Sequence, residues 1–155
     1  MIDGNKIDAR AIVGFYPCNS DDQDDIEIYE EDGTTLKTKF CTLRQQLDKD
    51  QDNFLALSDF VAPKSAGKKD YMGFFSCSAG HGQEEMCEKL KEDNDDYQIM
   101  MVKTLTDRLA EAFAEHLHQE VRTNLWGYAP NERLSVQECI NVKYQGIRPA
   151  PGYPT

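Results

Sequence analysis

The sequence predicts an α+β fold with an antiparallel sheet. Short apolar or alternating runs separated by turns fill the first half of the chain, and apolar residues spaced by three or four fill the second half. Strands followed by helices, rather than alternating with them, are typical of α+β proteins. At 155 residues the chain has the length of a single domain.

The first half contains the predicted strands. An apolar run at 11–16 is expected to end at Pro17. Two alternating runs flank the turn at 31–34, and this pattern predicts a half-buried hairpin. The run at 71–77 is the most apolar, so we expect it at the centre of the sheet. The strand candidates are residues 11–16, 25–30, 35–40, 54–61 and 71–77.

The predicted connections show no nucleotide-binding pattern. Residues 43–47 predict one or two helical turns, and 48–53 a polar loop. Gly80-His81-Gly82 lies between a predicted strand and helix, where phosphate-binding loops occur. It lacks the third Gly of the dinucleotide pattern and the Gly-Lys-Ser/Thr of a P-loop, so we interpret it as a plain turn.

The second half predicts three helices and an irregular tail. A short amphipathic helix covers 83–91, and a long one is expected to begin at Asp95 or Asp96 and to end at Gly127. Ser135 begins a capping box that opens a last short helix. The long helix carries one apolar stripe. Its members are Ile99, Val102, Leu105, Leu109, Phe113, Leu117, Val121 and Leu125.

Charge and cysteine content limit the classes of function. A net charge of −11 and a pI of 4.6 disfavour nucleic acid and anionic membranes as partners. No apolar run approaches the roughly 20 residues of a membrane span, and the N-terminus lacks a signal core, so a cytoplasmic location is expected. The five cysteines have no paired spacing and are expected to be free and mostly buried.

Two patterns partly match metal sites, and neither is expected to bind a metal. Residues 21–32 hold eight acids, but Ile26 stands where a calcium loop needs Gly, so a solvated loop is favoured. Glu115-x-x-His118 matches half of a di-metal site. The second half is missing, and His116 points about 160° away from His118 on the helix.

Two segments could form a ligand site. On the long helix, five polar residues fall within about 80° of one another: Asp107, Glu111, Glu115, His118 and Arg122. Residue geometry alone favours a solvated face with i,i+4 pairs over a cleft wall. In the tail, Arg148 offers a fork for a carboxylate and Tyr153 a ring face, but a surface polyproline turn fits as well.

Several segments together resemble the reactivation domain of cobalamin-dependent methionine synthase. The strongest are Asp107-Arg108-Leu109-Ala110-Glu111-Ala112-Phe113-Ala114-Glu115, Trp126-Gly127-Tyr128 and Gly146-Ile147-Arg148-Pro149-Ala150-Pro151-Gly152-Tyr153-Pro154. Further matches lie at 13–17, 24–29, 43–46, 57–63 and 95–97. The resemblance covers about residues 10–155 in the family's order.

This resemblance implies a twisted antiparallel sheet and a function. Domains of this family bind S-adenosylmethionine and present its methyl group to the cobalt of cobalamin, which another module carries, while a flavodoxin-like protein or flavoprotein reductase supplies an electron. The carried-over ligand residues are Glu111, Arg148, Ala150, Gly152 and Tyr153. Arg148 would hold the methionine carboxylate and Glu111 would face the cationic sulfonium or ammonium group. Asp107 and Glu115 are expected to be structural.

The family's domain extends further at both ends, so residues 1–155 are expected to be a partial activation domain that exposes apolar surface and is not catalytic on its own. The alternative is a non-catalytic interaction fragment that keeps the fold but has lost ligand binding. An acidic hydrolase using Glu111 and Glu115 is disfavoured because one helical turn separates them. Docking of the flavoprotein is expected at Lys64, Lys68 and Lys69, or at Lys37 and Lys39.

Overall fold

The computed structural model describes residues 7–46 and 53–150. The chain divides into two compact units, one of Ala11–Ser76 and one of Met1–Arg10 with Cys77–Thr155. Among the described residues, a four-stranded sheet has the order β3-β2-β1-β4. Its strands are β1 (Asp8–Ser20), β2 (Ile26–Tyr29), β3 (Leu36–Phe40) and β4 (Asp70–His81). The two long strands, β1 and β4, run through both units.

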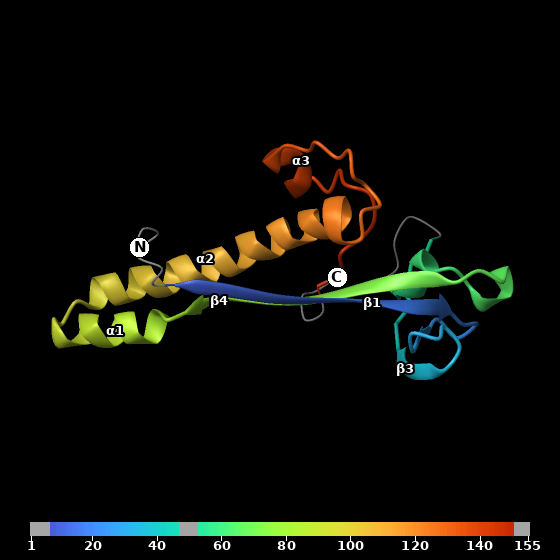
Figure 1. Cartoon of the computed structure of the whole chain (residues 1–155), viewed down its shortest axis with the longest axis horizontal. Coiled ribbons are helices and arrows are strands. Elements are labelled where there is room, and N and C mark those ends of the chain that lie inside the picture. Colours follow the sequence, from blue (N-terminus) through green and yellow to red (C-terminus); the bar gives the residue numbers. More distant parts are fainter. Residues whose placement is uncertain (1–6, 47–52, 151–155) are drawn as a thin grey trace. The chain divides into compact units, whose positions relative to one another are not determined.

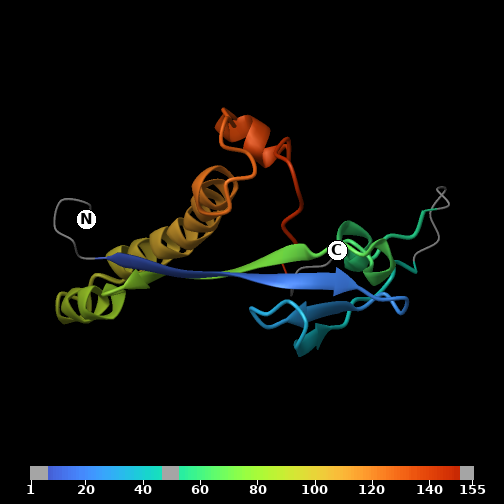
Figure 2. The same ribbon diagram turned by 45° about the vertical axis from the view of Figure 1, so that its right-hand side comes forward.

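β2 and β3 form an antiparallel hairpin at one edge of the sheet, and its prediction is confirmed (Figure 2). Ile26 pairs with Phe40 across the hairpin, while Ile28 pairs with Cys18 on β1. Alternate residues of a strand share a face, so Cys18, Ile26 and Ile28 meet in a buried core. Partly buried side chains surround it: Tyr16, Phe40, Leu57, Val61, Met72 and Phe74.

Strand β2 is buried along its whole length, rather than half-buried as its alternation predicted. The polar Glu27 is only 8% exposed. It accepts a hydrogen bond from the Tyr29 hydroxyl at 3.0 Å, and the amines of Lys64 and Lys39 approach the same carboxylate. The hydrogen bond from Lys64 holds the pKa of Glu27 below its usual range. Paired in this way, a carboxylate can be buried in the ladder.

Two predictions about strand length and position were wrong. Strand β1 continues through Pro17 to Ser20, because its ladder with β2 begins at Cys18 and the missing N–H of Pro17 falls outside that ladder. Strand β4 lies at the edge of the sheet, not at its centre. Its apolar composition suggested a central strand, but only every second side chain is covered along much of its length.

The segment between β3 and β4 was also predicted incorrectly. Residues 54–61 contain a 3-10 helix, Leu57–Phe60, in place of a strand, because the Asp59 carboxylate accepts a hydrogen bond from the Ala56 N–H at 2.9 Å and closes a local turn. Residues 43–46 are not helical. Leu47 and most of the predicted loop at 48–53 lie outside the described residues.

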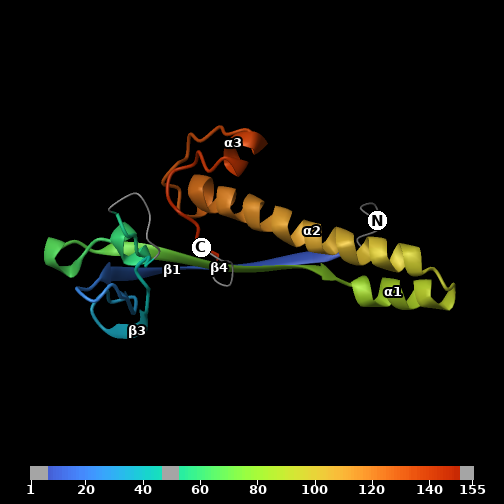
Figure 3. The same cartoon turned by 180° about the vertical axis from the view of Figure 1, so that it is seen from behind.

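Helices α1 (Gln83–Glu92) and α2 (Asp96–Glu120) pack side by side in the second unit (Figures 1 and 3). The Asp95 carboxylate caps α2 by accepting from the Gln98 N–H at 3.0 Å, as predicted. The helix then widens into a π-turn, Val121–Leu125, before Gly127 ends it with a φ of 74°. The capping box of α3 (Val136–Ile140) is confirmed.

The apolar stripe of α2 is covered only in part. Val102 is fully buried and Leu117 is 8% exposed, whereas Leu105 and Leu109 stay 42% and 41% exposed. The Gly80-His81-Gly82 turn joins the end of β4 to α1, with Gly82 as the N-cap residue. In residues 7–46 and 53–150, no helix is both long enough and apolar enough to cross a membrane.

Candidate functional site

The tail delivers Arg148 to the polar face of α2. Its Nη1 donates to the carbonyl oxygen of Ala114 at 3.3 Å, and its Nη2 donates to the carboxylate of Glu115. The Arg148 side chain is 23% exposed. Two segments that the sequence offered separately as ligand-binding candidates therefore meet at one place, and their contact runs through Glu115, which was expected to be merely structural.

The remaining predicted site residues are placed only in part. Glu111 is exposed and lies one helical turn before Glu115, about 6 Å along the same face of α2. Ala150 is exposed and lies in a segment without regular secondary structure. Gly152 and Tyr153 lie outside the described residues.

Arg122 is buried, although the sequence placed it on a solvated helix face. Its side chain is 1% exposed, and it donates to both oxygens of Glu132, from Nε at 2.9 Å and from Nη2 at 2.6 Å. Its Nη1 contacts Nδ1 of His118 at 2.8 Å. The predicted i,i+4 pair of His118 and Arg122 is thus confirmed, but it belongs to the protein interior.

The contacts of Arg122 define the charge states around it. Burial opposes the charge of the guanidinium, but the hydrogen bonds and charge of Glu132 outweigh this and raise the pKa of Arg122. The hydrogen bond from Arg122 lowers the pKa of Glu132. Burial, together with the positive charges of Arg122 and Arg148, lowers the pKa of His118 to about 4. His118 is therefore neutral at pH 7, and its Nδ1 accepts from Arg122.

Two tyrosines attach the chain before Arg148 to this region. The Arg122 guanidinium lies over the Tyr144 ring, 4.4 Å from its centroid, and the His118 ring meets the same ring edge-on at 4.8 Å. The Tyr128 hydroxyl donates to the carbonyl oxygen of Gln145 at 3.1 Å. Sequence reasoning missed Glu132 and Tyr144. Tyr128 was marked only as part of the Trp126-Gly127-Tyr128 match.

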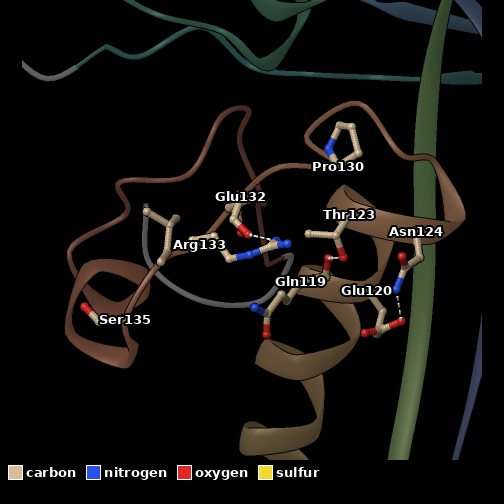
Figure 4. Close-up of a pocket in the computed structure, with 9 residues that line it drawn as sticks. Gln119, Glu120, Thr123, Asn124, Pro130, Glu132, Arg133 and Ser135 are labelled. Atoms are coloured by element: carbon tan, nitrogen blue, oxygen red, sulfur yellow. Dashed lines mark hydrogen bonds between the residues drawn. The ribbon is translucent and has the colours of Figure 1, made fainter.

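A polar pocket of about 710 Å³ is lined in part by Glu132, the carboxylate partner of Arg122 (Figure 4). One wall comes from the end of α2 and the π-turn, including Glu120 and Asn124, which are joined by a 2.8 Å hydrogen bond. The other wall comes from Pro130 and from residues 132–135. Glu132 belongs both to this wall and to the contacts of Arg122. The sequence did not predict this pocket.

The acidic run at 21–32 is engaged by neighbouring groups in the first unit. Asp21 lies 2.6 Å from Lys39, and Glu30 lies 2.8 Å from Lys37. Asp32 accepts hydrogen bonds from Thr34 and Thr35 and thereby shapes the turn. Within the described ranges, no group of three or more His, Cys, Asp or Glu side chains is placed to hold a metal ion.

The lysines expected to dock a flavoprotein are largely engaged within their own unit. Lys64 and Lys39 approach Glu27, and Lys37 pairs with Glu30. Lys69 lies 3.6 Å from the centroid of the Tyr29 ring. Lys37, Lys39 and Lys64, three of the five lysines in that prediction, are thus paired with carboxylates of their own unit. All five cysteines are free as predicted, but only Cys18 and Cys87 are buried.

The fold and these residues define an α+β domain in which a proline-rich tail places an arginine against a carboxylate-bearing helix. The chain belongs to the activation domain family of vitamin B12 dependent methionine synthase, whose family model matches residues 1–155. The crystal structure of the MetH reactivation domain bound to AdoHcy is similar, with 49% sequence identity and a TM-score of 0.87. The match covers 96% of this chain and 46% of that chain, so this chain spans about half the length of that relative.

Proposed function

We propose that this chain is an S-adenosylmethionine-binding module for reductive remethylation of cobalamin in methionine synthase. The observation that carries the proposal is the position of Arg148, held on α2 by Ala114 and Glu115, one helical turn from Glu111. A cationic fork and a carboxylate thus lie within the length of an amino-acid ligand. The family membership and the AdoHcy-bound relative support the same ligand class.

The residues present fit the chemistry of this ligand. A guanidinium has five N–H donors, and two of the groups on Arg148 already bond to α2, which leaves donors for the methionine carboxylate. Glu111 would attract the ammonium or sulfonium group. Ala150, Gly152 and Tyr153 would lie along the adenosyl part, where the N–H groups between the prolines can donate.

The chain's own contribution is binding and orientation. S-adenosylmethionine supplies an electrophilic methyl group, and the acceptor would be the cobalt of a separate cobalamin-binding module, with a flavodoxin-like protein or flavoprotein reductase as electron donor. The residues of this chain would hold the S-methyl group in line with that acceptor, and positioning of this kind can account for a large part of a rate enhancement. No residue of the chain needs to act as a nucleophile or proton donor.

Isothermal titration calorimetry of the chain with S-adenosylmethionine tests the proposal. We expect saturable binding that Arg148→Ala weakens by roughly 10- to 100-fold, since a hydrogen-bonded charge partner is lost. Arg108→Ala, at an exposed position of α2, is the matched control and should bind like the wild type. No binding heat at millimolar ligand from a folded chain would refute ligand binding and favour the non-catalytic interaction fragment.

A further inference from the structure

We infer that the cluster formed by the buried His118 and Arg122 with the partly buried Glu132 and Tyr144 is a positioning device for Arg148. This inference rests on the proposed function and deepens it. The four residues come from α2, the π-turn, the loop after it and the segment that leads to Arg148. They would act on the ligand through the backbone between Tyr144 and Arg148, without touching the ligand.

The first step is that the burial of Arg122 fixes its partners. A guanidinium that is 1% exposed must have its donors satisfied, because an unpaired buried charge is strongly destabilising. Nε and Nη2 donate to Glu132, Nη1 donates to His118, and the flat face covers Tyr144. Moving any of these partners would leave the buried charge exposed or unpaired, so the cluster holds Glu132 and Tyr144 against the end of α2.

The second step is that the π-turn anchors the loop carrying Glu132. Its wider turn is closed by a hydrogen bond from the Trp126 N–H to the carbonyl oxygen of Val121 at 2.9 Å. The carbonyl oxygen of Arg122 accepts from the Ala129 N–H at 2.9 Å, and that of Ala129 from the Glu132 N–H at 3.0 Å. The backbone therefore fixes the loop to the same residue whose side chain binds Glu132.

The third step leads from the cluster to Arg148. Tyr144 is held by Arg122 and His118, and the next carbonyl, that of Gln145, accepts from the Tyr128 hydroxyl. Gly146 has a φ of 94°, and a Cβ there would lie 3.1 Å from the same hydroxyl oxygen. Tyr144 and Gln145 are thus tied to α2 and to Tyr128, and Gly146 lets the backbone pass close to the Tyr128 hydroxyl two residues before Arg148.

The test compares Tyr144→Leu with Tyr144→Phe in the 155-residue chain. One readout is the Nε–H NMR signal of Arg148 in the ligand-free protein, assigned with Arg148→Lys, and the other is the calorimetric Kd for S-adenosylmethionine. We expect Tyr144→Leu to shift the signal towards that of a solvated arginine and to weaken binding about tenfold. Tyr144→Phe keeps the ring over Arg122 and should match the wild type in both readouts.

A milder variant keeps the test decisive if Tyr144→Leu does not fold. Tyr128→Phe deletes only the hydroxyl that holds Gln145, and Tyr97→Phe, at a residue 64% exposed, is its matched control. The inference predicts a smaller shift of the Arg148 signal in Tyr128→Phe and none in the control. It is overturned if the folded variants keep the wild-type signal. Absence of binding by the wild type would refute the proposed function alone, because the NMR readout needs no ligand.

Discussion

Arg148 of the tail and Glu115 of α2 form an ion pair across 33 residues of sequence. The guanidinium also donates to the carbonyl oxygen of Ala114, so the Arg148 side chain docks on one turn of the helix. Glu115 is thereby an orienting partner of the residue proposed to bind the ligand carboxylate, a role that the sequence did not reveal.

Charge reversal at Glu115 should therefore weaken binding of S-adenosylmethionine by at least about tenfold. Glu115→Lys replaces attraction by repulsion and drives the Arg148 side chain off the helix. Asp107→Lys makes the same change two turns earlier at an exposed position and should have little effect. Calorimetry of both variants checks this, and equal losses would point to a general charge effect instead.

His118 should lower the free energy of unfolding as the pH decreases below about 6.5. Its pKa of about 4 in the folded state lies below the ordinary 6.5, so between these values the unfolded chain binds more protons and stability rises with pH. From pH 7 to pH 4.5 the wild type should lose about 2 kcal/mol more than His118→Asn, measured by urea unfolding. His116→Asn, at an exposed position, should follow the wild type.

A side chain at Gly80 should destabilise the fold. A Cβ there would lie 3.2 Å from Cβ of Thr106, and the φ of 101° is strained for any other residue. Gly80→Ala should cost about 2–3 kcal/mol in the free energy of unfolding. At Gly127 the φ is 74° and the closest atom is 3.5 Å away, so Gly127→Ala should cost only about 1 kcal/mol. Similar losses in chemical denaturation would mean that the contact with Thr106 adds nothing.

Val142 should be replaceable with a gain in stability. It occupies the left-handed position after α3, with a φ of 54°, while the N–H groups of Val142 and Lys143 close the helix end. Val142→Gly should raise the free energy of unfolding by about 1 kcal/mol by removing the strain of a β-branched residue. Val136→Gly, at the first residue of α3, should instead lower it slightly, by roughly 0.3–0.5 kcal/mol. Urea melts of both variants give the two signs.

Local patterns predicted the elements whose signals are local. The alternation around 31–34 gave the hairpin, and Asp95, Ser135 and Gly127 marked helix ends through their own backbone geometry. The resemblance to the family and its α+β fold is confirmed. The 3-10 helix at Leu57–Phe60 was missed because it is closed by a hydrogen bond from the Ala56 N–H to the Asp59 carboxylate. Hydrophobic periodicity carries no information about such side-chain hydrogen bonds.

The site was only partly predictable, because its decisive contacts join distant residues. Helical spacing placed Arg122 beside His118, but it could not predict that Glu132 and Tyr144 would cover Arg122. Burial of a charge is decided by partners 10 and 22 residues away. The same reason hid the contact of Glu115 with Arg148.

The buried guanidinium of Arg122 also bears on how this part of the chain opens. Most of residues 126–146 have no regular ladder of their own, yet Glu132 and Tyr144 contact a charge that cannot be left without partners. Their amide hydrogens should therefore exchange together with those at the C-terminal end of α2, as a single cooperative unit, and a protease should find no early cleavage site between Tyr128 and Tyr144.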